Sequence, residues 1–460
     1  MVNIFRALGQ VKDDRLRLAD GDADGVVRRG ALTAAAPGRI TEAGRKRLRG
    51  WAMGCAEVGQ TSHEEKLTMS TQQAELIQGK CIWNITRVPD RERTRMEFPH
   101  LLRFRDSWFC SFREGEIHHV HPSGRVRVIR SIDGEQWETA AVMSWQGGDV
   151  RDSRLSVTAE GCLMLNCVVK FCSDEPGADG HYGVHPSGAS SDEQERHTVW
   201  QSVTWLSSDG VHWSSAYACP TGANTWRWDA VWHGGMGYSV GYGGKDVDGT
   251  LYRTRDGKSW RTLRESLFPP TGGNEAALAF GPDGTGYCLL RDAQPRSDEA
   301  QPSRETVRDA DGHSVTGQHR DKVLGGNVPM FGIGEAPSYQ NWHWKPIRVD
   351  YGAAYGGEQP ADRLFRAPLG GPNLLRLSTG RLIAAARMLG PDRDDGRATI
   401  FGVTCEPGKD TAVLTRIAEC DGTSYPGVAE HEGRLWISFI SRAAREDTWE
   451  VHLANMAMPE

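Results

Sequence analysis

Short runs of apolar residues, separated by turns that contain glycine, recur along most of the chain. In six places an apolar run, a glycine-containing turn and a second apolar run follow one another. The first runs of these six pairs begin at Phe98, Arg154, Asp229, Glu275, Asn373 and Tyr425. Short apolar runs bounded by turn residues are typical of β-strands. The pattern therefore predicts six β-hairpins.

A second repeated element is the motif (Ser/Thr)-x-Asp-Gly-x-x-Trp. It occurs at residues 131–137, 207–213 and 254–260, and residues 338–342 form a degenerate fourth copy. Each full copy lies between two strand-like runs. Asp can accept hydrogen bonds from nearby backbone amides, Gly accepts a positive φ, and Trp can cover the apolar side of a hairpin. The motif therefore predicts the tips of further β-hairpins.

Together the two kinds of hairpin predict a fold. One inner hairpin followed by one outer hairpin gives four antiparallel strands, and six such sheets arranged radially form a β-propeller. We predict an all-β, six-bladed propeller of four-stranded blades over residues 79–460. Residues 80–88 are apolar and are expected to close the ring by pairing with the last blade. Two polar stretches, 173–196 and 292–326, are expected to be long loops.

Residues 1–78 differ from the rest of the chain. They hold only two aromatic residues, Phe5 and Trp51, and a basic cluster at residues 45–49. Charged residues interrupt every candidate apolar run, so no secretory signal is recognised and a cytoplasmic location is predicted. We predict a disordered N-terminal extension, or a mis-assigned start with Met69 as the true initiator. A nucleic-acid-binding arm is an alternative interpretation of the basic cluster.

Composition excludes several classes of protein. The 460 residues carry 54 Lys plus Arg and 60 Asp plus Glu, a net charge of −6. This balance lacks the basic footprint of a protein whose main partner is nucleic acid. With a mean hydropathy of −0.52 and no apolar stretch of about 18 residues, no membrane span is predicted. The ten cysteines contain no C-x-x-C pair, and buried thiols rather than disulfides, a metal site or a cofactor are expected.

The Asp-Gly-Trp turns resemble the Asp-boxes of the sialidase-like propeller superfamily, and the resemblance extends over residues 80–460. In that superfamily Asp-boxes lie at the periphery, far from the active site. The resemblance therefore implies a structural role for Asp133, Asp209 and Asp256.

The resemblance also implies a catalytic pair. Sialidase-like enzymes use a Tyr nucleophile partnered by a Glu, with an Asp acid/base and three Arg that bind the substrate carboxylate. Glu275, followed 16 residues later by Arg291, resembles the segment that supplies the Glu and one Arg. The sequence around Tyr425 resembles the last-blade segment that supplies the Tyr. A phenol with a pKa of about 10 is a weak nucleophile unless a carboxylate takes its proton.

The sequence departs from the superfamily pattern in its first blade. Where an Arg-x-Pro element is expected, the chain has Glu97-Phe98-Pro99. Arg113 matches the Arg that ends the first hairpin. His119, beside His118, stands about where the acid/base Asp would fall, and a His with a pKa of about 6.5 suits proton transfer. Asp152, which lies between two arginines, is the alternative acid.

Further residues are candidates for substrate binding. Arg154 and Arg387 occupy positions like those of Arg113 and Arg291, and a guanidinium binds a carboxylate through two parallel hydrogen bonds. The predicted partner is therefore an acidic carbohydrate: a uronic, sialic-like or sulfated sugar. At the third hairpin, Trp226 and Trp228 are candidate sugar contacts, because sugar rings stack on indole. Arg227, His233 and His118 are further candidates for substrate binding.

Three functions follow from these residues. The first is a glycosidase with Tyr425 and Glu275 as the nucleophile pair and His119 or Asp152 as acid/base. The second is a polysaccharide lyase that uses His or Tyr as the base on a uronate. The third is a glycan-binding propeller without turnover. The sugar, the linkage and the oligomeric state are not predicted.

Overall fold

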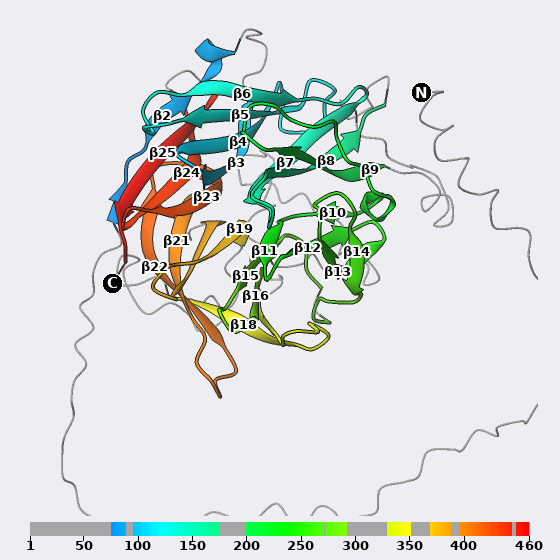
Figure 1. The fold of residues 1–460 in the computed structure, drawn as a ribbon. Helices are drawn as coiled ribbons and strands as arrows, with labels where there is room; N and C mark the ends of the chain where they lie inside the picture. The colour runs from blue at the N-terminus through cyan, green and yellow to red at the C-terminus, as the bar shows by residue number, and fades with distance from the viewer. Residues whose placement is uncertain are drawn as a thin grey trace, which may run out of the picture. The chain divides into compact units, whose positions relative to one another are not determined.

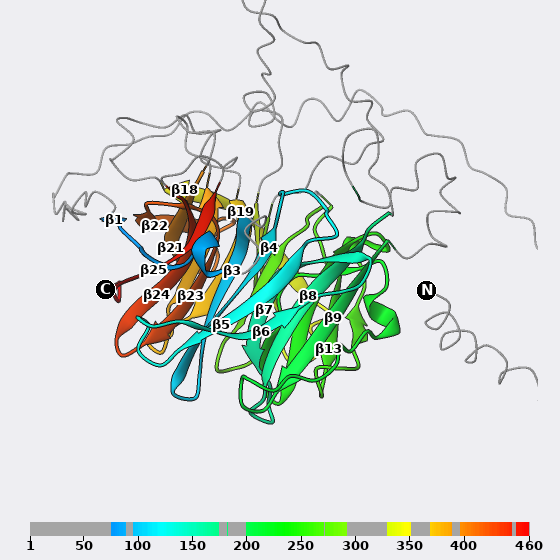
Figure 2. The same ribbon diagram turned by 90° about the horizontal axis from the view of Figure 1, so that it is seen from above.

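The computed structural model describes residues 75–88, 95–173, 182, 199–270, 272–291, 329–350, 369–388, 396–443 and 448–459. The chain divides into two units, Met1–Thr68 and Met69–Glu460, and all described residues belong to the second. Most of the predicted extension, residues 1–78, and nearly all of the two predicted loops therefore lie outside the described residues. Of the extension, Glu75–Ile77 form a strand, β1, that pairs in parallel with β22 (Ala412–Cys420) (Figure 2).

The regular secondary structure of the described residues is almost entirely β-strand, arranged in five sheets (Figure 1). The first sheet contains β3 (Arg95–Phe104), β4 (Ser107–Gly115), β5 (Arg125–Ser131) and β6 (Glu138–Met143). The second contains β7 (Gly148–Val157), β8 (Leu163–Phe171) and β9 (Trp200–Ser207). The third contains β10 (Trp226–Arg227), β11 (Val231–His233), β12 (Met236–Gly243), β13 (Asp246–Thr254) and β14 (Arg261–Arg264).

A nine-stranded sheet follows. One group of antiparallel strands is β15 (Ala276–Phe280), β16 (Gly286–Leu290), β17 (Met330–Gly334) and β18 (Trp342–Asp350). The other is β19 (Leu369–Arg376), β20 (Leu382–Met388), β21 (Arg397–Thr404) and β22, with β1 at its edge. The two groups are joined where β18 pairs in parallel with β22. Because the strands form five sheets, the predicted number of six blades stays a prediction.

The last sheet joins the two ends of the described chain. It contains β23 (Thr423–His431), β24 (Arg434–Arg442), β25 (Trp449–Ala457) and the early strand β2 (Lys80–Trp83). Lys80 lies opposite Leu453 in the antiparallel pair of β2 and β25. This confirms for residues 80–83 the prediction that residues 80–88 pair with the last blade. A single turn of 3-10 helix, η2 (Ile85–Arg87), follows β2, and η3 (Pro220–Gly222) precedes β10.

The sheets stand around a common centre (Figure 1). Their innermost strands contact one another in a closed cycle: β3, β7, β11, β15, β19, β23 and β3 again. Apolar clusters fill the spaces between neighbouring sheets, as where Phe109 of β4 packs with Leu165 of β8. Both faces of a strand such as β8 are therefore buried, which explains why such strands are continuous apolar runs rather than alternating ones. All-β propeller architecture is thus observed.

The repeated Asp-Gly-Trp turns have the predicted chemistry. In the first copy, the Asp133 carboxylate accepts hydrogen bonds from the amides of Glu135 and Gln136 at 2.8 and 2.9 Å, and these bonds lower its pKa to about 2. The Trp137 indole donates to the carbonyl of Gly134, whose φ is +77°. The other two full copies repeat both sets of bonds. The degenerate copy retains only the indole bond, from Trp342 to a carbonyl three residues earlier.

Two further observations concern the described residues. No helix among them is both long and apolar enough to cross a membrane. Their cysteines are free thiols, some fully and some partly buried.

The turn glycines predict a difference in stability between two substitutions. A Cβ at Gly210 (φ +81°) would lie 2.3 Å from Phe109 Cζ of the neighbouring sheet, whereas a Cβ at Gly161 (φ +76°) would meet nothing within 4 Å. Both alanines adopt a left-handed conformation at a cost of about 1–2 kcal/mol, but only Gly210→Ala overpacks the core, which costs about 1–3 kcal/mol more. Thermal unfolding should therefore show a clearly larger fall in Tm for Gly210→Ala. Equal falls would contradict the packing of this turn against β4.

Candidate active site

Irregularities in the innermost strands create the candidate site. The register of strand pairing shifts within β3 near Phe98, within β7 near Asp152, within β19 near Gly371 and within β23 near Tyr425. Phe98, Asp152 and Gly371 have positive φ values of 57°, 50° and 58°. A β-bulge redirects side chains, and strained backbone of this kind is concentrated at functional sites. Four innermost strands thus break their regular pairing beside the same group of side chains.

A buried tyrosine and a buried glutamate meet at this place. Tyr425 donates a hydrogen bond from its hydroxyl to Glu275 Oε1 at 3.0 Å. Glu275 lies immediately before β15, and its other carboxylate oxygen accepts a hydrogen bond from the amide of Gly371 at 2.8 Å. A Cβ at Gly371 would lie 1.8 Å from Tyr425 Cγ, so only glycine allows this close approach. Tyr425 and Glu275 are therefore in direct contact, and their catalytic roles stay predictions.

Arg291 completes a triangle with these two residues. Its Nη1 donates to the Tyr425 hydroxyl oxygen at 3.0 Å and lies 2.8 Å from Glu275 Oε1. The backbone explains this placement, because the Arg291 amide donates to the Glu275 carbonyl at 2.9 Å across the β15–β16 hairpin. The predicted spacing of 16 residues thus corresponds to the two ends of one hairpin. The guanidinium can stabilise negative charge on the phenol oxygen or on the carboxylate.

Aromatic rings surround the tyrosine. Its ring centroid lies 5.1 Å from that of Phe98 and 5.5 Å from that of Trp228. Trp228 is fully buried and held by a hydrogen bond from its indole to the Pro372 carbonyl. Burial, with the charge of Glu275 as the second cause, raises the pKa of Tyr425 above its usual range. The phenol therefore keeps its proton at neutral pH until the carboxylate accepts it.

Asp152 is a buried acid that interacts electrostatically with both Tyr425 and Glu275. Its side chain is buried, and Oδ1 has no hydrogen-bond partner among the described residues. Burial is the main cause that raises the pKa of Asp152 to about 6; Glu275 raises it further, while Arg151 and Arg154 lower it. A carboxyl group with this pKa can donate a proton near neutral pH. The role of Asp152 as the alternative acid stays a prediction.

Two of the predicted arginines lie near this group with donors to spare. The guanidinium of Arg387, on β20, lies 5.6 Å from the centroid of the Tyr425 ring and is half-buried. Arg154 is fully buried with its guanidinium 4.2 Å from the Trp228 ring, and neither Nη atom has a hydrogen-bond partner among the described residues. Both are placed to contact a polar ligand or water in this region.

Arg113 does not have the arrangement predicted for a substrate-binding residue. It is fully buried, and its Nε and Nη2 bind the Asp149 carboxylate at 2.9 and 2.8 Å. Nη1 donates to Glu97 at 2.7 Å, and the carbonyls of Ile117 and His119 accept further bonds. The guanidinium is therefore used to hold the loop after β4. This geometry corrects the prediction, because a guanidinium engaged on all sides cannot also bind a carboxylate ligand.

The two histidines of that loop are exposed. His118 Nδ1 lies 2.6 Å from Glu97 Oε1, and its ring packs against Phe98 at 5.9 Å. The ring of His119 lies 5.7 Å from that of His118. Glu97, whose pKa is lowered to about 2 chiefly by His118 and Arg113 against the effect of burial, links the loop to Arg113. His118 thus borders the aromatic group, and the catalytic role of His119 stays a prediction.

The predicted residues of the third hairpin lie in different parts of the structure. Trp226 stacks on Tyr242 and belongs to the aromatic group of Phe98, Trp228 and Tyr425. Arg227 points the other way: it is fully buried with its guanidinium 5.1 Å from the Trp260 ring of a repeated turn. Neighbouring strand residues face opposite sides, so Trp226 and Arg227 cannot both face the site. The prediction for Arg227 is therefore wrong.

His233 also lies away from the site, contrary to the prediction. Its ring stacks on Phe280 with centroids 5.0 Å apart. Phe280 ends β15, whereas Glu275 precedes its start, so His233 lies at the opposite end of this strand from the Tyr425 and Glu275 pair. The chain follows β11 from Asp229 toward the hairpin turn, so His233, the last residue of β11, lies beside that turn.

Two residues of the site, Phe98 and Gly371, were missed in the sequence. Phe98 forms a wall beside Tyr425, as does the candidate sugar contact Trp228, and Gly371 supplies an amide to Glu275. A signal was present, because Phe98, Gly371 and Tyr425 are each followed by proline. Proline within sheets is confined to edges and bulges, so three repeated x-Pro pairs mark the irregular positions.

Comparison with solved structures identifies the architecture. A protein of unknown function from Dyadobacter fermentans superposes with a TM-score of 0.53 and 14% identity, covering 84% of this chain and 98% of that one. The NanB sialidase of Streptococcus pneumoniae superposes with a TM-score of 0.51 and 11% identity, covering 83% and 70%. The Hadza microbial sialidase Hz136 has a TM-score of 0.51 and 13% identity, covering 82% and 68%.

The chain has the sialidase-like β-propeller fold. No family model matches the sequence, and no curated protein does. At these identities the likeness establishes the fold alone. The site of this sialidase-like propeller must therefore be argued from its own residues.

The buried acid predicts a pH-dependent stability. The pKa of Asp152 is about 6 in the folded protein and about 3.9 when unfolded. The folded state therefore holds a proton that the unfolded state has lost, and this stabilisation is full below pH ~4 and lost as pH rises through ~6. In urea unfolding, Asp152→Asn should become more stable relative to wild type by up to about 3 kcal/mol between pH ~4 and ~7.

The control for this measurement is Asp106→Asn, at an exposed position. Its stability relative to wild type should be the same at both pH values. A pH-independent difference for Asp152→Asn as well would show that Asp152 is not a buried, proton-holding carboxyl.

Proposed function

We propose that this sialidase-like propeller is a glycoside hydrolase that removes a terminal sugar with retention of anomeric configuration. The observation that carries the proposal is the hydrogen-bonded triangle of Tyr425, Glu275 and Arg291, with Asp152 in electrostatic contact. Two neighbours of the same fold are named sialidases, which supports a glycan-directed activity. We further propose six blades, in which the nine-stranded sheet comprises two four-stranded blades joined through β18 and β22, with β1 at its edge.

The proposed first step forms a bond between sugar and tyrosine. The Tyr425 oxygen attacks the anomeric carbon while its proton passes to Glu275 Oε1, to which it is already hydrogen-bonded. Arg291 Nη1 donates to the same phenol oxygen and stabilises the charge that develops on it. Asp152, in its neutral form, gives a proton to the glycosidic oxygen of the leaving group.

The second step releases the sugar. Asp152, now a carboxylate, accepts a proton from a water molecule, whose oxygen attacks the anomeric carbon. The bond to Tyr425 breaks, and the phenol oxygen regains its proton from Glu275. Each residue thus returns to its initial state. A neutral phenol held beside a carboxylate suits this cycle, since the proton moves over an existing hydrogen bond.

The proposed substrate carries an anionic group near the reacting carbon. Arg387 is half-buried beside the Tyr425 ring, and Arg291 presents a partly exposed guanidinium to the same place. Two guanidiniums converging at one site favour a carboxylate or sulfate. Glu97 stands where the resemblance implied another arginine, and Phe98, the next residue, packs against Tyr425. We therefore propose an anionic sugar held by two arginines and an apolar wall, rather than by an arginine triad.

A polysaccharide lyase is the less favoured candidate. A lyase base must remove a proton from carbon, and the Tyr425 phenol instead donates to a buried carboxylate. His119, the other predicted base, is exposed. The geometry of Asp152 and Glu275 around one tyrosine favours hydrolysis.

Removing the phenol oxygen tests the nucleophile. Tyr425→Phe keeps the ring packing and removes the attacking atom, so kcat on activated aryl glycosides of uronic and sialic acids should fall by about 10³-fold or more. Tyr339→Phe is the matched control: it removes a buried hydroxyl that donates to the Gly284 carbonyl, in another part of the fold. Its kcat should equal that of wild type.

Three outcomes would contradict the proposal. Unchanged turnover in Tyr425→Phe would remove the tyrosine from the mechanism. An unsaturated uronate product, detected by its ultraviolet absorbance, would show a lyase. Saturable binding of acidic oligosaccharides by the wild type without product after long incubation would show a binding protein.

The pH profile tests the acid. Because Asp152 donates only in its protonated form and its pKa is about 6, kcat/KM should decline as pH rises through ~6. Asp152→Asn should lose about 10²–10⁴-fold on substrates with poor leaving groups, and much less on nitrophenyl glycosides, which need no protonation. An unaltered alkaline limb in Asp152→Asn would assign the acid to another residue, with His119 the first to test.

A further inference from the structure

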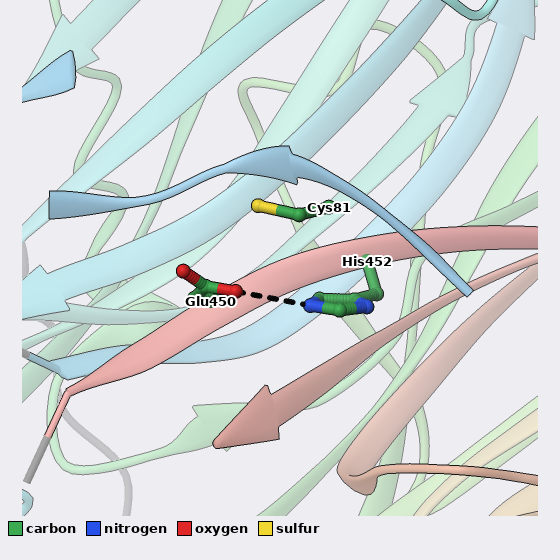
Figure 3. Close-up of side chains that lie close together, drawn as sticks. All are labelled: Cys81, Glu450 and His452. Atoms are coloured by element: carbon green, nitrogen blue, oxygen red, sulfur yellow. Dashed lines mark hydrogen bonds and ion pairs between the residues drawn. The ribbon is translucent and has the colours of Figure 1, made fainter. Parts of the chain in front are cut away.

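Cys81, Glu450 and His452 form a second cluster of reactive side chains, on strands β2 and β25 (Figure 3). Cys81 lies directly opposite His452 in the strand pair, and Glu450 precedes His452 by two residues on the same face of β25. One ligand atom from each residue lies within 4.8 Å of the others. Among the described residues this is the only group of three or more His, Cys, Asp or Glu side chains that meets this condition.

The imidazole of His452 is oriented for a ligand. Its Nδ1 lies 3.2 Å from the Gly79 carbonyl, and its Nε2 lies 3.3 Å from Glu450 Oε2. In the tautomer with the hydrogen on Nδ1, that nitrogen donates to the carbonyl and Nε2 presents its lone pair beside the carboxylate. Phe439 packs against the ring at 5.7 Å. A backbone carbonyl that fixes one nitrogen while the other faces a carboxylate is the usual second layer of a metal-binding histidine.

The spacing of these atoms fits a tetrahedral cation. Two donors about 2.0–2.1 Å from a zinc ion at a tetrahedral angle lie about 3.3 Å apart. This matches the 3.3 Å between Nε2 and Oε2 without any movement. The third donor, the sulfur of Cys81, interacts with the Glu450 carboxylate and makes long contacts with the Trp83 carbonyl and the Asn84 amide, at 3.6 and 3.7 Å. A side-chain rotation of the thiol can therefore bring it into the ligand set.

The donor types select the class of cation. Thiolate, imidazole and carboxylate together suit zinc and similar borderline cations, whereas calcium and magnesium require oxygen ligands. Burial and the neighbouring Glu450 raise the pKa of the Cys81 thiol to about 11, so the free thiol keeps its proton. Binding therefore releases that proton to solvent as the sulfur–metal bond forms.

We propose that Cys81, Glu450 and His452 bind one zinc ion that fastens β2 to β25 and so stabilises the closed ring. The three side chains belong to the outer two strands of the last sheet, whereas Tyr425 belongs to β23, the innermost. The zinc site is thus structural and separate from the proposed chemistry. Water completes the tetrahedron as a fourth ligand. The ion crosslinks a strand near the start of the described chain to one near its end.

Cobalt binding tests the proposal directly. The full-length protein is treated with a chelator, titrated with Co²⁺ alone, and examined by absorption spectroscopy. We expect one ion per chain, with the visible bands of tetrahedral cobalt and the near-ultraviolet band of a thiolate bond. Zn²⁺ should displace the cobalt and raise Tm. Cys81→Ser should abolish the thiolate band and weaken zinc binding at least tenfold.

Cys162→Ser, which replaces another partly buried free cysteine, should leave both signals unchanged. If Cys81→Ser does not fold, Glu450→Gln provides the second test: it should retain the thiolate band and weaken zinc binding. The proposal is overturned if cobalt gives only octahedral spectra without a thiolate band. It is also overturned if zinc raises Tm equally in wild type and in either ligand variant, because the cation would then bind elsewhere.

Discussion

The pairing of β2 with β25 is the contact on which the rest of the structure depends. An unpaired edge strand leaves backbone N–H and C=O groups without hydrogen-bond partners. A circular arrangement of sheets must also bring its last sheet against its first. Residues 80–83 meet residues 451–453 across almost the whole length of the described chain. This closure sets β23 beside β3 and β19. Tyr425 can then reach Glu275, 150 residues away, through a single hydrogen bond.

The centre of the ring places charged and strained groups where burial makes them effective. Tyr425, Glu275 and Asp152 are all buried, and each bears on the proton affinity of another. The positive charges of Arg291, Arg387 and the arginines flanking Asp152 offset the cost of burying the carboxylates in the interior. The left-handed residues Phe98, Asp152 and Gly371 hold these side chains in place, and the regular strands around them supply the stability that such strain requires.

Much of this could be predicted from the sequence because it is local. The Asp-Gly-Trp turns are fixed by hydrogen bonds within five residues, and Glu275 and Arg291 meet because one hairpin joins them. The errors concern direction and long-range partners. Arg227 faces the side opposite to Trp226 because the two are neighbours on one strand. Arg113 is bound by Asp149, a residue of the next sheet. No local pattern reveals such a partner. The x-Pro pairs at Phe98, Gly371 and Tyr425 could have predicted these irregular positions, because proline within sheets is confined to edges and bulges.

The proposed mechanism requires Tyr425 as the nucleophile, and trapping a covalent intermediate would show which residue attacks the sugar. Activated fluorinated glycosides of sialic, uronic and neutral sugars slow the second step and leave the sugar on the enzyme. Peptide mapping by mass spectrometry then locates it. We expect a sugar adduct on the peptide that contains Tyr425 in the wild type, and no adduct on that peptide in the Tyr425→Phe variant. A sugar attached to Glu275 or Asp152, or turnover of these reagents with inverted anomeric configuration, would contradict it.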